Sequence, residues 1–131
     1  MKIIEDVCQG LRYLAFLGIV HRDIKPANIL KGKDGNWKIA DFGFSIDISD
    51  VQNEKKLSIG TPVYMAPEVI KSGIYSFQSD IFALGIMIYR LLHDGNYLWF
   101  EANKKKILKL MLNCDVSEIE LPYPFNTQFF Q

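Results

Sequence analysis

The sequence has no excess of charge of either sign and no long hydrophobic run. Fifteen basic and fifteen acidic side chains cancel in a chain of 131 residues, so no overall electrostatic field attracts nucleic acid or an anionic membrane. The longest apolar run, Ile81 to Tyr89, is much shorter than the roughly 20 residues that a membrane-spanning helix requires. We therefore expect local binding sites, and neither nucleic acid nor a membrane among the partners.

Cysteine is also scarce. The chain has two cysteines, Cys8 and Cys114, which are too few for a disulfide framework and match no zinc-ligand spacing. We expect both to be buried thiols in a reducing compartment, which favours the cytoplasm or, alternatively, the nucleus. Apolar residues make up 49% of the chain, which is enough for the core of one globular domain.

The first forty residues show a helical pattern followed by a strand pattern. Apolar side chains at helical spacing over residues 3–17 predict a first helix, and Gly18 stands where a left-handed C-terminal cap would end it. Two apolar segments, at residues 29–30 and 37–40, flank a turn that contains Asp34-Gly35. This arrangement indicates a β-hairpin.

The remaining chain predicts two more helices. Residues 44–56 are mostly polar and have no period, so we expect a mobile surface segment or loop there. From Ser79, taken as the N-cap, a helix runs to the stop signal Asp94-Gly95; it has no polar face, so we expect burial on nearly every side. An amphipathic helix over residues 102–112 presents lysines as a solvated face or, alternatively, as a docking surface.

Polar side chains at the hairpin form a candidate metal site. Asn28 precedes the first strand and Asp41 follows the second, so antiparallel pairing brings the two side chains toward each other. Both supply the hard oxygen ligands that magnesium prefers. Asp23 and Lys25 add two charges in the loop just before the hairpin. Taken singly, each residue is equally typical of an ordinary turn or strand entry.

Three motifs occur in a fixed order: HRDIKPAN at residues 21–28, DFG at 41–43 and GTPVYMAPE at 60–68. Together they resemble the signature of eukaryotic protein kinases. The presence of Lys25 two positions after Asp23, and of Gly60-Thr61 before VYMAPE, resembles the Ser/Thr-specific rather than the Tyr-specific kinases. The resemblance extends over essentially the whole chain. It implies an α+β, mainly α fold, the large C-terminal lobe of a kinase, with a small β-hairpin between the catalytic loop and DFG.

The resemblance also implies roles for individual residues. Asp23 would be the catalytic base that accepts the proton of a substrate hydroxyl, and Lys25 would neutralise charge on the transferred group. Thr61 would hydrogen-bond to both and help to form the substrate platform. The implied cofactors are ATP and Mg²⁺, and the implied partner is a protein with Ser or Thr hydroxyls; the oligomeric state stays open. The residues that would contact ATP are Lys25, Asn28, Leu30 and Asp41, with Asn28 and Asp41 as the magnesium ligands.

Other matched residues have structural or regulatory roles in such kinases. His21 and Phe42 resemble residues that stack in the internal spine linking the two lobes, so we expect packing rather than proton transfer from both. Asp80 resembles an aspartate that accepts backbone hydrogen bonds from the catalytic loop; alternatively, it interacts with the helix dipole. Arg22 matches an arginine that pairs with a phosphorylated segment. Among Ser45, Ser49 and Ser58, we take Ser58 as the candidate phosphorylation site because it lies nearest to Gly60.

The match is incomplete in one respect. Kinases of this family also carry a Gly-rich loop over the phosphates and a strand lysine paired with a glutamate, and neither occurs in this sequence. We expect residues 1–131 to be a partial kinase domain whose small lobe and last helices lie outside the chain. The alternative is a catalytically inactive kinase-like interaction module without an ATP-binding lobe. We also expect Glu68 to be a buried charge whose arginine partner is missing.

Overall fold

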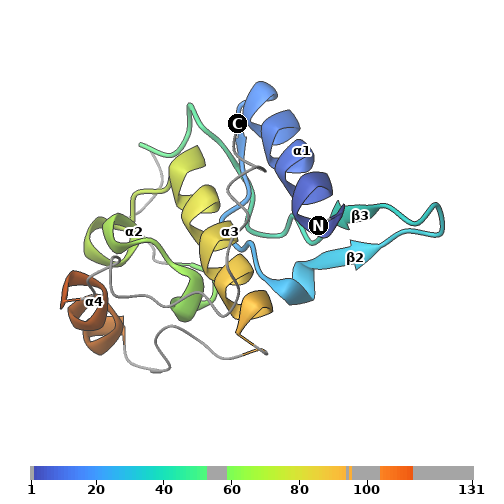
Figure 1. Cartoon of the computed structure of the whole chain (residues 1–131). Coiled ribbons are helices and arrows are strands. Elements are labelled where there is room, and N and C mark those ends of the chain that lie inside the picture. The colour runs from blue at the N-terminus through green and yellow to red at the C-terminus, as the bar shows by residue number, and fades with distance from the viewer. Residues whose placement is uncertain (1, 53–58, 94, 96–103, 114–131) are drawn as a thin grey trace, which may run out of the picture.

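The computed structural model describes residues 2–52, 59–93, 95 and 104–113 (Figure 1). Within these residues the fold is mostly helical, with two small antiparallel sheets formed by β1 with β4 and by β2 with β3. The helices and strands are, in chain order, α1 (Lys2–Phe16), β1 (Ile19–Val20), β2 (Ile29–Lys31), β3 (Trp37–Ile39), β4 (Ile46–Asp47), α2 (Pro67–Ser72), α3 (Phe77–Leu92) and α4 (Lys104–Asn113), and 3-10 turns lie at Pro26–Asn28 and Pro62–Tyr64.

Helix α1 confirms the first helical pattern. Its buried side chains, Val7, Leu11 and Leu14, recur at helical spacing and form one face of the main hydrophobic core. The helix ends just before Gly18, whose φ of 75° is the left-handed conformation predicted for the cap. Helix α1 lies beside α3 (Figure 1). The core between them includes Ile24, which belongs to the loop after β1.

The predicted hairpin is also present. Strands β2 and β3 pair with Ile29 opposite Ile39 and Lys31 opposite Trp37. The hairpin is attached to α1, because the Asp6 carboxylate accepts a hydrogen bond from the Trp37 N–H at 2.9 Å. That bond lowers the pKa of Asp6. The start of α1 thus fixes the base of the hairpin.

The prediction for residues 44–56 was wrong in part. Strand β4 lies inside this segment and pairs with β1, with Ile19 opposite Asp47 and Val20 opposite Ile46. Two-residue strands have no measurable period, so the sequence pattern did not indicate them. Residues 53–56 of the segment lie outside the described residues. The β1–β4 pair matters because the loop that begins at His21 leaves directly from β1.

Helix α3 crosses the middle of the molecule (Figure 1) but differs from the prediction in two ways. It begins one turn earlier, because Ser76 is the N-cap and forms a reciprocal capping box with Ser79. It is also not buried all round, since Ile81 is 56% exposed and Leu91 is 42% exposed. Its buried residues are Ser79, Asp80, Ala83, Leu84, Ile86 and Met87.

The last helix and the cysteines complete the comparison with the sequence. Helix α4 overlaps the predicted range, packs beside α2 and buries Ile107. Three of its lysines, Lys105, Lys106 and Lys109, are exposed as predicted. Cys8 is exposed rather than buried, and Cys114 lies outside the described residues. None of the described helices combines the length and the apolar character that crossing a bilayer requires.

Candidate active site

A buried aspartate on α3 anchors the loop between β1 and β2. The two carboxylate oxygens of Asp80 accept hydrogen bonds from the backbone N–H groups of His21, at 2.7 Å, and Arg22, at 2.9 Å. Burial raises the pKa of Asp80, and the two N–H groups oppose that rise. These are the backbone contacts predicted for Asp80. Arg22 itself is held at a φ of 70°, a left-handed conformation that a non-glycine residue adopts only under constraint.

His21 is fully buried and both of its ring nitrogens are occupied. Its Nδ1 accepts a hydrogen bond from the Asp23 N–H at 3.3 Å, and its Nε2 lies 3.1 Å from the Ala40 oxygen. Because Nδ1 accepts, Nε2 is the ring nitrogen that donates a hydrogen bond to the Ala40 oxygen. The ring also contacts Phe42 edge-on, with centroids 5.1 Å apart. The two rings are thus packed against each other, as expected, in an edge-to-face contact.

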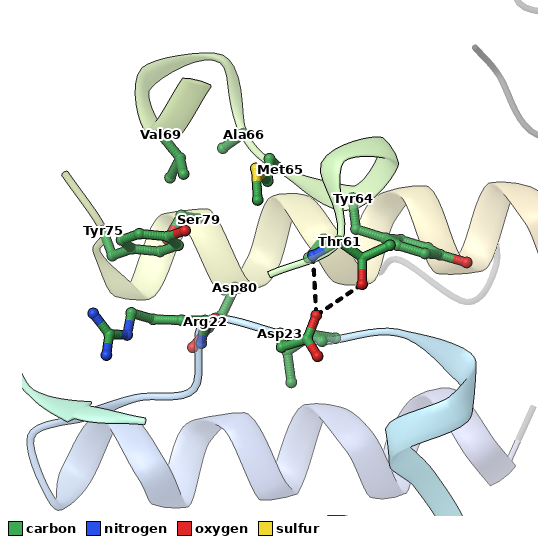
Figure 2. A pocket seen from close by; sticks show the side chains of 12 residues that line it. Arg22, Asp23, Thr61, Tyr64, Met65, Ala66, Val69, Tyr75, Ser79 and Asp80 are labelled. Carbon is green, nitrogen blue, oxygen red and sulfur yellow. Dashed lines mark hydrogen bonds between the residues drawn. The ribbon is translucent and has the colours of Figure 1, made fainter. Parts of the chain in front are cut away.

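The carboxylate of Asp23 lies at the centre of a hydrogen-bonded cluster. One oxygen, Oδ1, accepts from the Thr61 N–H at 3.2 Å and from the Thr61 hydroxyl at 3.0 Å (Figure 2). The other, Oδ2, accepts from Lys25 Nζ at 2.7 Å and from Asn28 Nδ2 at 3.1 Å. Lys25 also donates to the Thr61 hydroxyl at 3.1 Å. Asp23, Lys25, Asn28 and Thr61, predicted as site residues, are thus brought together.

Thr61 reaches Asp23 because Gly60 lets two backbone segments come close. Gly60 has a φ of 102°. A Cβ built on Gly60 would lie 2.6 Å from the backbone oxygen of Arg22. A side chain at this position is therefore excluded both by conformation and by space. The requirement explains why a glycine directly precedes the threonine, and the GT pair in the sequence was the signal for it.

The proposed metal ligands lie at one end of the hairpin. The Ala40 N–H donates to the backbone oxygen of Asn28 at 2.8 Å, which continues the β2–β3 pairing by one residue. Ala40 therefore lies opposite Asn28, and Asp41 follows directly after it. Asp41 has a φ of 60° and is exposed, and its Oδ1 accepts from the Gly43 N–H at 3.2 Å. Leu30 lies on β2, 55% exposed, outside the Asp23 cluster.

A metal site made by the protein alone is not evident in the described part of the chain. No group of three or more His, Cys, Asp or Glu side chains comes together there. The donor set of one amide oxygen and one carboxylate fits magnesium better than a transition metal, because magnesium keeps water and substrate phosphates as its other ligands. The side-chain nitrogen of Asn28, Nδ2, donates to the Asp23 backbone oxygen and to Asp23 Oδ2. The side-chain oxygen, Oδ1, is therefore the group that a cation would bind.

The two regulatory predictions, for Arg22 and Ser58, stay predictions, whereas the structural expectation for Glu68 was wrong. Arg22 is buried, its Nε donates to the Phe44 oxygen, and its guanidinium lies 5.4 Å from the centre of the Tyr75 ring. Ser58 lies outside the described residues, so its proposed phosphorylation stays a prediction. Glu68 is exposed on α2, so the expectation of a buried charge there was wrong: the first turn of α2 points this side chain to solvent.

Tyr75 is the residue near the site that the sequence pattern did not indicate. It lines a cavity between the Asp23 loop and α3, together with Arg22, Thr61 and Asp80 (Figure 2). It is 5% exposed, and its hydroxyl donates to the Ile59 oxygen. Tyr75 belongs to none of the three motifs, and a single residue between two helices shows no periodic pattern. Its place beside the Asp23 loop is therefore seen only in the structure.

Comparison with known proteins gives consistent results. The yeast Saccharomyces cerevisiae protein "Serine/threonine-protein kinase SKM1" is 33% identical over 126 residues, 96% of this chain and 19% of that protein. The "Serine/threonine-protein kinase CST20" of Candida albicans is 41% identical over 120 residues, 92% of this chain and 10% of that protein. The "Serine/threonine-protein kinase pakA" of Dictyostelium discoideum is 33% identical over 127 residues, 97% of this chain and 10% of that protein.

The chain thus spans between 10% and 19% of the length of these three relatives. A family model described as the protein kinase domain matches residues 1–129. The matched range contains the Asp23 cluster, the hairpin and all the described helices. The chain therefore belongs to the protein kinase domain family.

Proposed function

We propose that the protein carrying this chain is a Ser/Thr protein kinase, which transfers the γ-phosphoryl group of ATP to Ser or Thr hydroxyls of other proteins. In this proposal residues 1–131 form part of the large C-terminal lobe. The observation that carries it is the Asp23 cluster, in which Lys25 and Thr61 hold opposite oxygens of one buried carboxylate. The names of the similar proteins support the Ser/Thr class.

Asp23 is the group that orients the substrate hydroxyl. Its four hydrogen-bond donors fix the direction of both oxygens before any substrate binds. A substrate hydroxyl that donates to Asp23 points its oxygen lone pair toward the γ-phosphorus. Asp23 would receive the proton as the new O–P bond forms and the bond from the γ-phosphorus to the bridging oxygen breaks, with ADP as the leaving group. Such fixed positioning is the main contribution that a protein makes to phosphoryl transfer.

Lys25 supplies the positive charge on the side of the transferred group. Its ammonium lies 2.7 Å from Asp23 and 3.1 Å from the Thr61 hydroxyl, and its side chain is 27% exposed. The ammonium is therefore accessible to a phosphate oxygen while it stays oriented by two partners. A preorganised cation at this place stabilises the charge that spreads over the phosphoryl oxygens.

Asn28 and Asp41 are the residues that would hold Mg²⁺, through an amide oxygen and a carboxylate. When bound, the ion neutralises the negative charge of the ATP phosphates. Leu30, which is half exposed on β2, offers apolar surface for the nucleotide. The left-handed backbone at Asp41 is consistent with a functional side chain, since strained residues gather at ligand sites.

We also propose a cytoplasmic or nuclear location. The exposed free thiol of Cys8 supports a reducing compartment, because such a thiol would be prone to oxidation elsewhere. Subcellular fractionation with a tagged full-length protein tests this: recovery in a secretory fraction would contradict the proposal.

The test of the function uses the full-length natural protein that carries this chain. We expect it to label Ser- and Thr-containing peptides, but not Tyr-containing ones, from ATP labelled at the γ-phosphate. Replacement Asp23→Asn should lower kcat between about a hundredfold and ten-thousandfold and leave ATP binding largely intact, because Asp23 acts on the hydroxyl. An inactive natural protein that binds no ATP would instead favour the inactive interaction module.

A further inference from the structure

Tyr75 stands between α2 and α3 and contacts the two chain segments that meet at Asp23. Its side chain is almost completely buried and faces the cavity between the Asp23 loop and α3 (Figure 2). Its hydroxyl end reaches the segment that leads to Thr61, and its ring faces Arg22 in the loop that contains Asp23. One side chain therefore touches both segments.

The hydroxyl of Tyr75 fixes the path of residues 59–61. It donates to the backbone oxygen of Ile59, two residues before Thr61. Between them, Gly60 passes so close to the Arg22 oxygen that it has no room for a Cβ. A small displacement of Ile59 is transmitted through this tight contact to Thr61, whose N–H and hydroxyl orient Asp23.

The ring of Tyr75 restrains the other segment. The Arg22 guanidinium lies 5.4 Å from the ring centre, within the range of a cation–π interaction. The same guanidinium donates through Nε to the Phe44 oxygen. Arg22 is the residue directly before Asp23 and has a strained backbone, so its conformation needs such contacts to persist.

The backbone around Tyr75 is itself firmly held. Helix α2 ends at Gly73 in the left-handed conformation, with the Gly73 N–H bonded to the Val69 oxygen at 2.8 Å. Helix α3 begins directly after Tyr75 with the capping box of Ser76 and Ser79. The next residue of α3, Asp80, holds the backbone of the loop. Tyr75 and Asp80 thus act from one rigid helix start on the same loop.

We propose that Tyr75 is a positioning residue for the phosphoryl transfer: it keeps Thr61 and Arg22 in register so that the Asp23 carboxylate stays aimed at the substrate hydroxyl. This inference rests on the proposed kinase function. Tyr75 touches no substrate and acts only through Thr61 and Arg22. Of the four proposed ATP contacts, Asn28, Leu30 and Asp41 belong to the hairpin end of the site, and Lys25 keeps its ion pair with Asp23. Loss of Tyr75 therefore lowers kcat without weakening ATP binding.

The experiment measures kcat and the KM for ATP of the full-length protein with two replacements. Tyr75→Phe removes the hydrogen bond to Ile59 and keeps the ring under Arg22; we expect kcat to fall about fivefold, the scale of one buried hydrogen bond. Tyr75→Leu removes both contacts; we expect a fall of about thirtyfold or more. The KM for ATP should change by less than about twofold in both.

A destabilised control separates positioning from loss of folding. Val7 is fully buried in the other part of the core, on α1, so Val7→Ala lowers the melting temperature without touching either contact of Tyr75. Assays are run well below all melting temperatures and normalised to folded protein. Val7→Ala should then keep the kcat of the unaltered protein, while Tyr75→Phe should not.

Each outcome is decisive. A kcat for Tyr75→Phe equal to that of the unaltered protein would overturn the inference and leave the proposed function standing. An equal fall of kcat in Val7→Ala would overturn it as well, by showing that stability alone is measured. A parallel rise in the KM for ATP would do the same. An unaltered protein with no kinase activity would overturn both the inference and the proposed function.

Discussion

The two aspartates of the candidate site are held in different ways. Asp23 is 5% exposed, and four donors from three different residues contact its carboxylate. Asp41 is exposed, and the hydrogen bond that its carboxylate accepts comes from Gly43, within its own turn. The chain itself builds the surroundings of Asp23, whereas Asp41 presents its charge to solvent.

The difference teaches which half of the site the chain prepares in advance. A group that must aim a proton acceptor within a fraction of an ångström needs several fixed partners. A group that binds a hydrated cation needs an accessible oxygen, because magnesium brings water and phosphate ligands with it. We therefore expect changes around Asp23 to cost folding stability as well as activity, and changes at Asp41 to affect ligand binding alone.

The largest loss of stability is expected for Gly60→Ala. The new Cβ would lie 2.6 Å from the Arg22 oxygen at a φ of 102°, so the free energy of unfolding should fall by about 3 kcal/mol or more. Because Thr61 is displaced with it, kcat should fall about a hundredfold. Urea unfolding and steady-state kinetics measure the two effects.

Gly35→Ala is the matched control for this change. Gly35 has a φ of 78° at the tip of the hairpin, and a Cβ there meets no atom within 4 Å. It carries the conformational cost alone, about 1–2 kcal/mol, and should leave kcat unchanged. Equal losses of stability and kcat in the two variants would show that the close approach to Arg22 is unimportant.

A smaller effect is expected for Thr61→Ala. The replacement removes the hydroxyl that donates to Asp23 and accepts from Lys25, so the free energy of unfolding should fall by about 1–2 kcal/mol. The Asp23–Lys25 ion pair remains, and kcat should fall about tenfold. Thr61→Ser keeps the hydroxyl and should restore most of kcat. A serine variant as slow as the alanine variant would contradict the role given to the hydroxyl.

The sequence predicted the parts of this site that depend on local pattern. The spacing of apolar residues predicted α1 and its cap at Gly18, and the turn at Asp34-Gly35 predicted the hairpin; the structure confirms both. The motif order gave the cluster of Asp23 with Thr61, which lie 38 positions apart. Pattern alone does not bring such distant residues together; the resemblance to protein kinases supplied that pairing.

The parts that the sequence did not predict depend on contacts between distant segments. Strand β4 exists because it pairs with β1, and two residues are too few to show a strand period. The predicted N-cap of α3 is Ser79, whereas the structure has Ser76. Both are favourable cap residues, and the reciprocal hydrogen bonds between them select Ser76. Tyr75 contacts Ile59 and Arg22, which are distant from it in the sequence, so no local pattern indicates these contacts.

The smallest change in stability is expected for Asp41→Asn, which tests the exposed half of the comparison. Asparagine also adopts left-handed backbone readily, and its side-chain oxygen still accepts from the Gly43 N–H. The free energy of unfolding should therefore change by less than about 0.5 kcal/mol. The loss of the negative charge should nevertheless raise the Mg²⁺ concentration for half-maximal kinase activity by about tenfold or more.

The control is Asp34→Asn, which removes the same charge from an exposed turn of the hairpin, where Asp34 pairs with Lys38 at 3.0 Å. It should not alter the Mg²⁺ requirement, because the hairpin tip lies at the end of β2 and β3 opposite Asn28 and Asp41. A stability loss at Asp41→Asn as large as that of Thr61→Ala would abolish the distinction between the two aspartates. The exposed carboxylate would then be part of the folded framework, as Asp23 is.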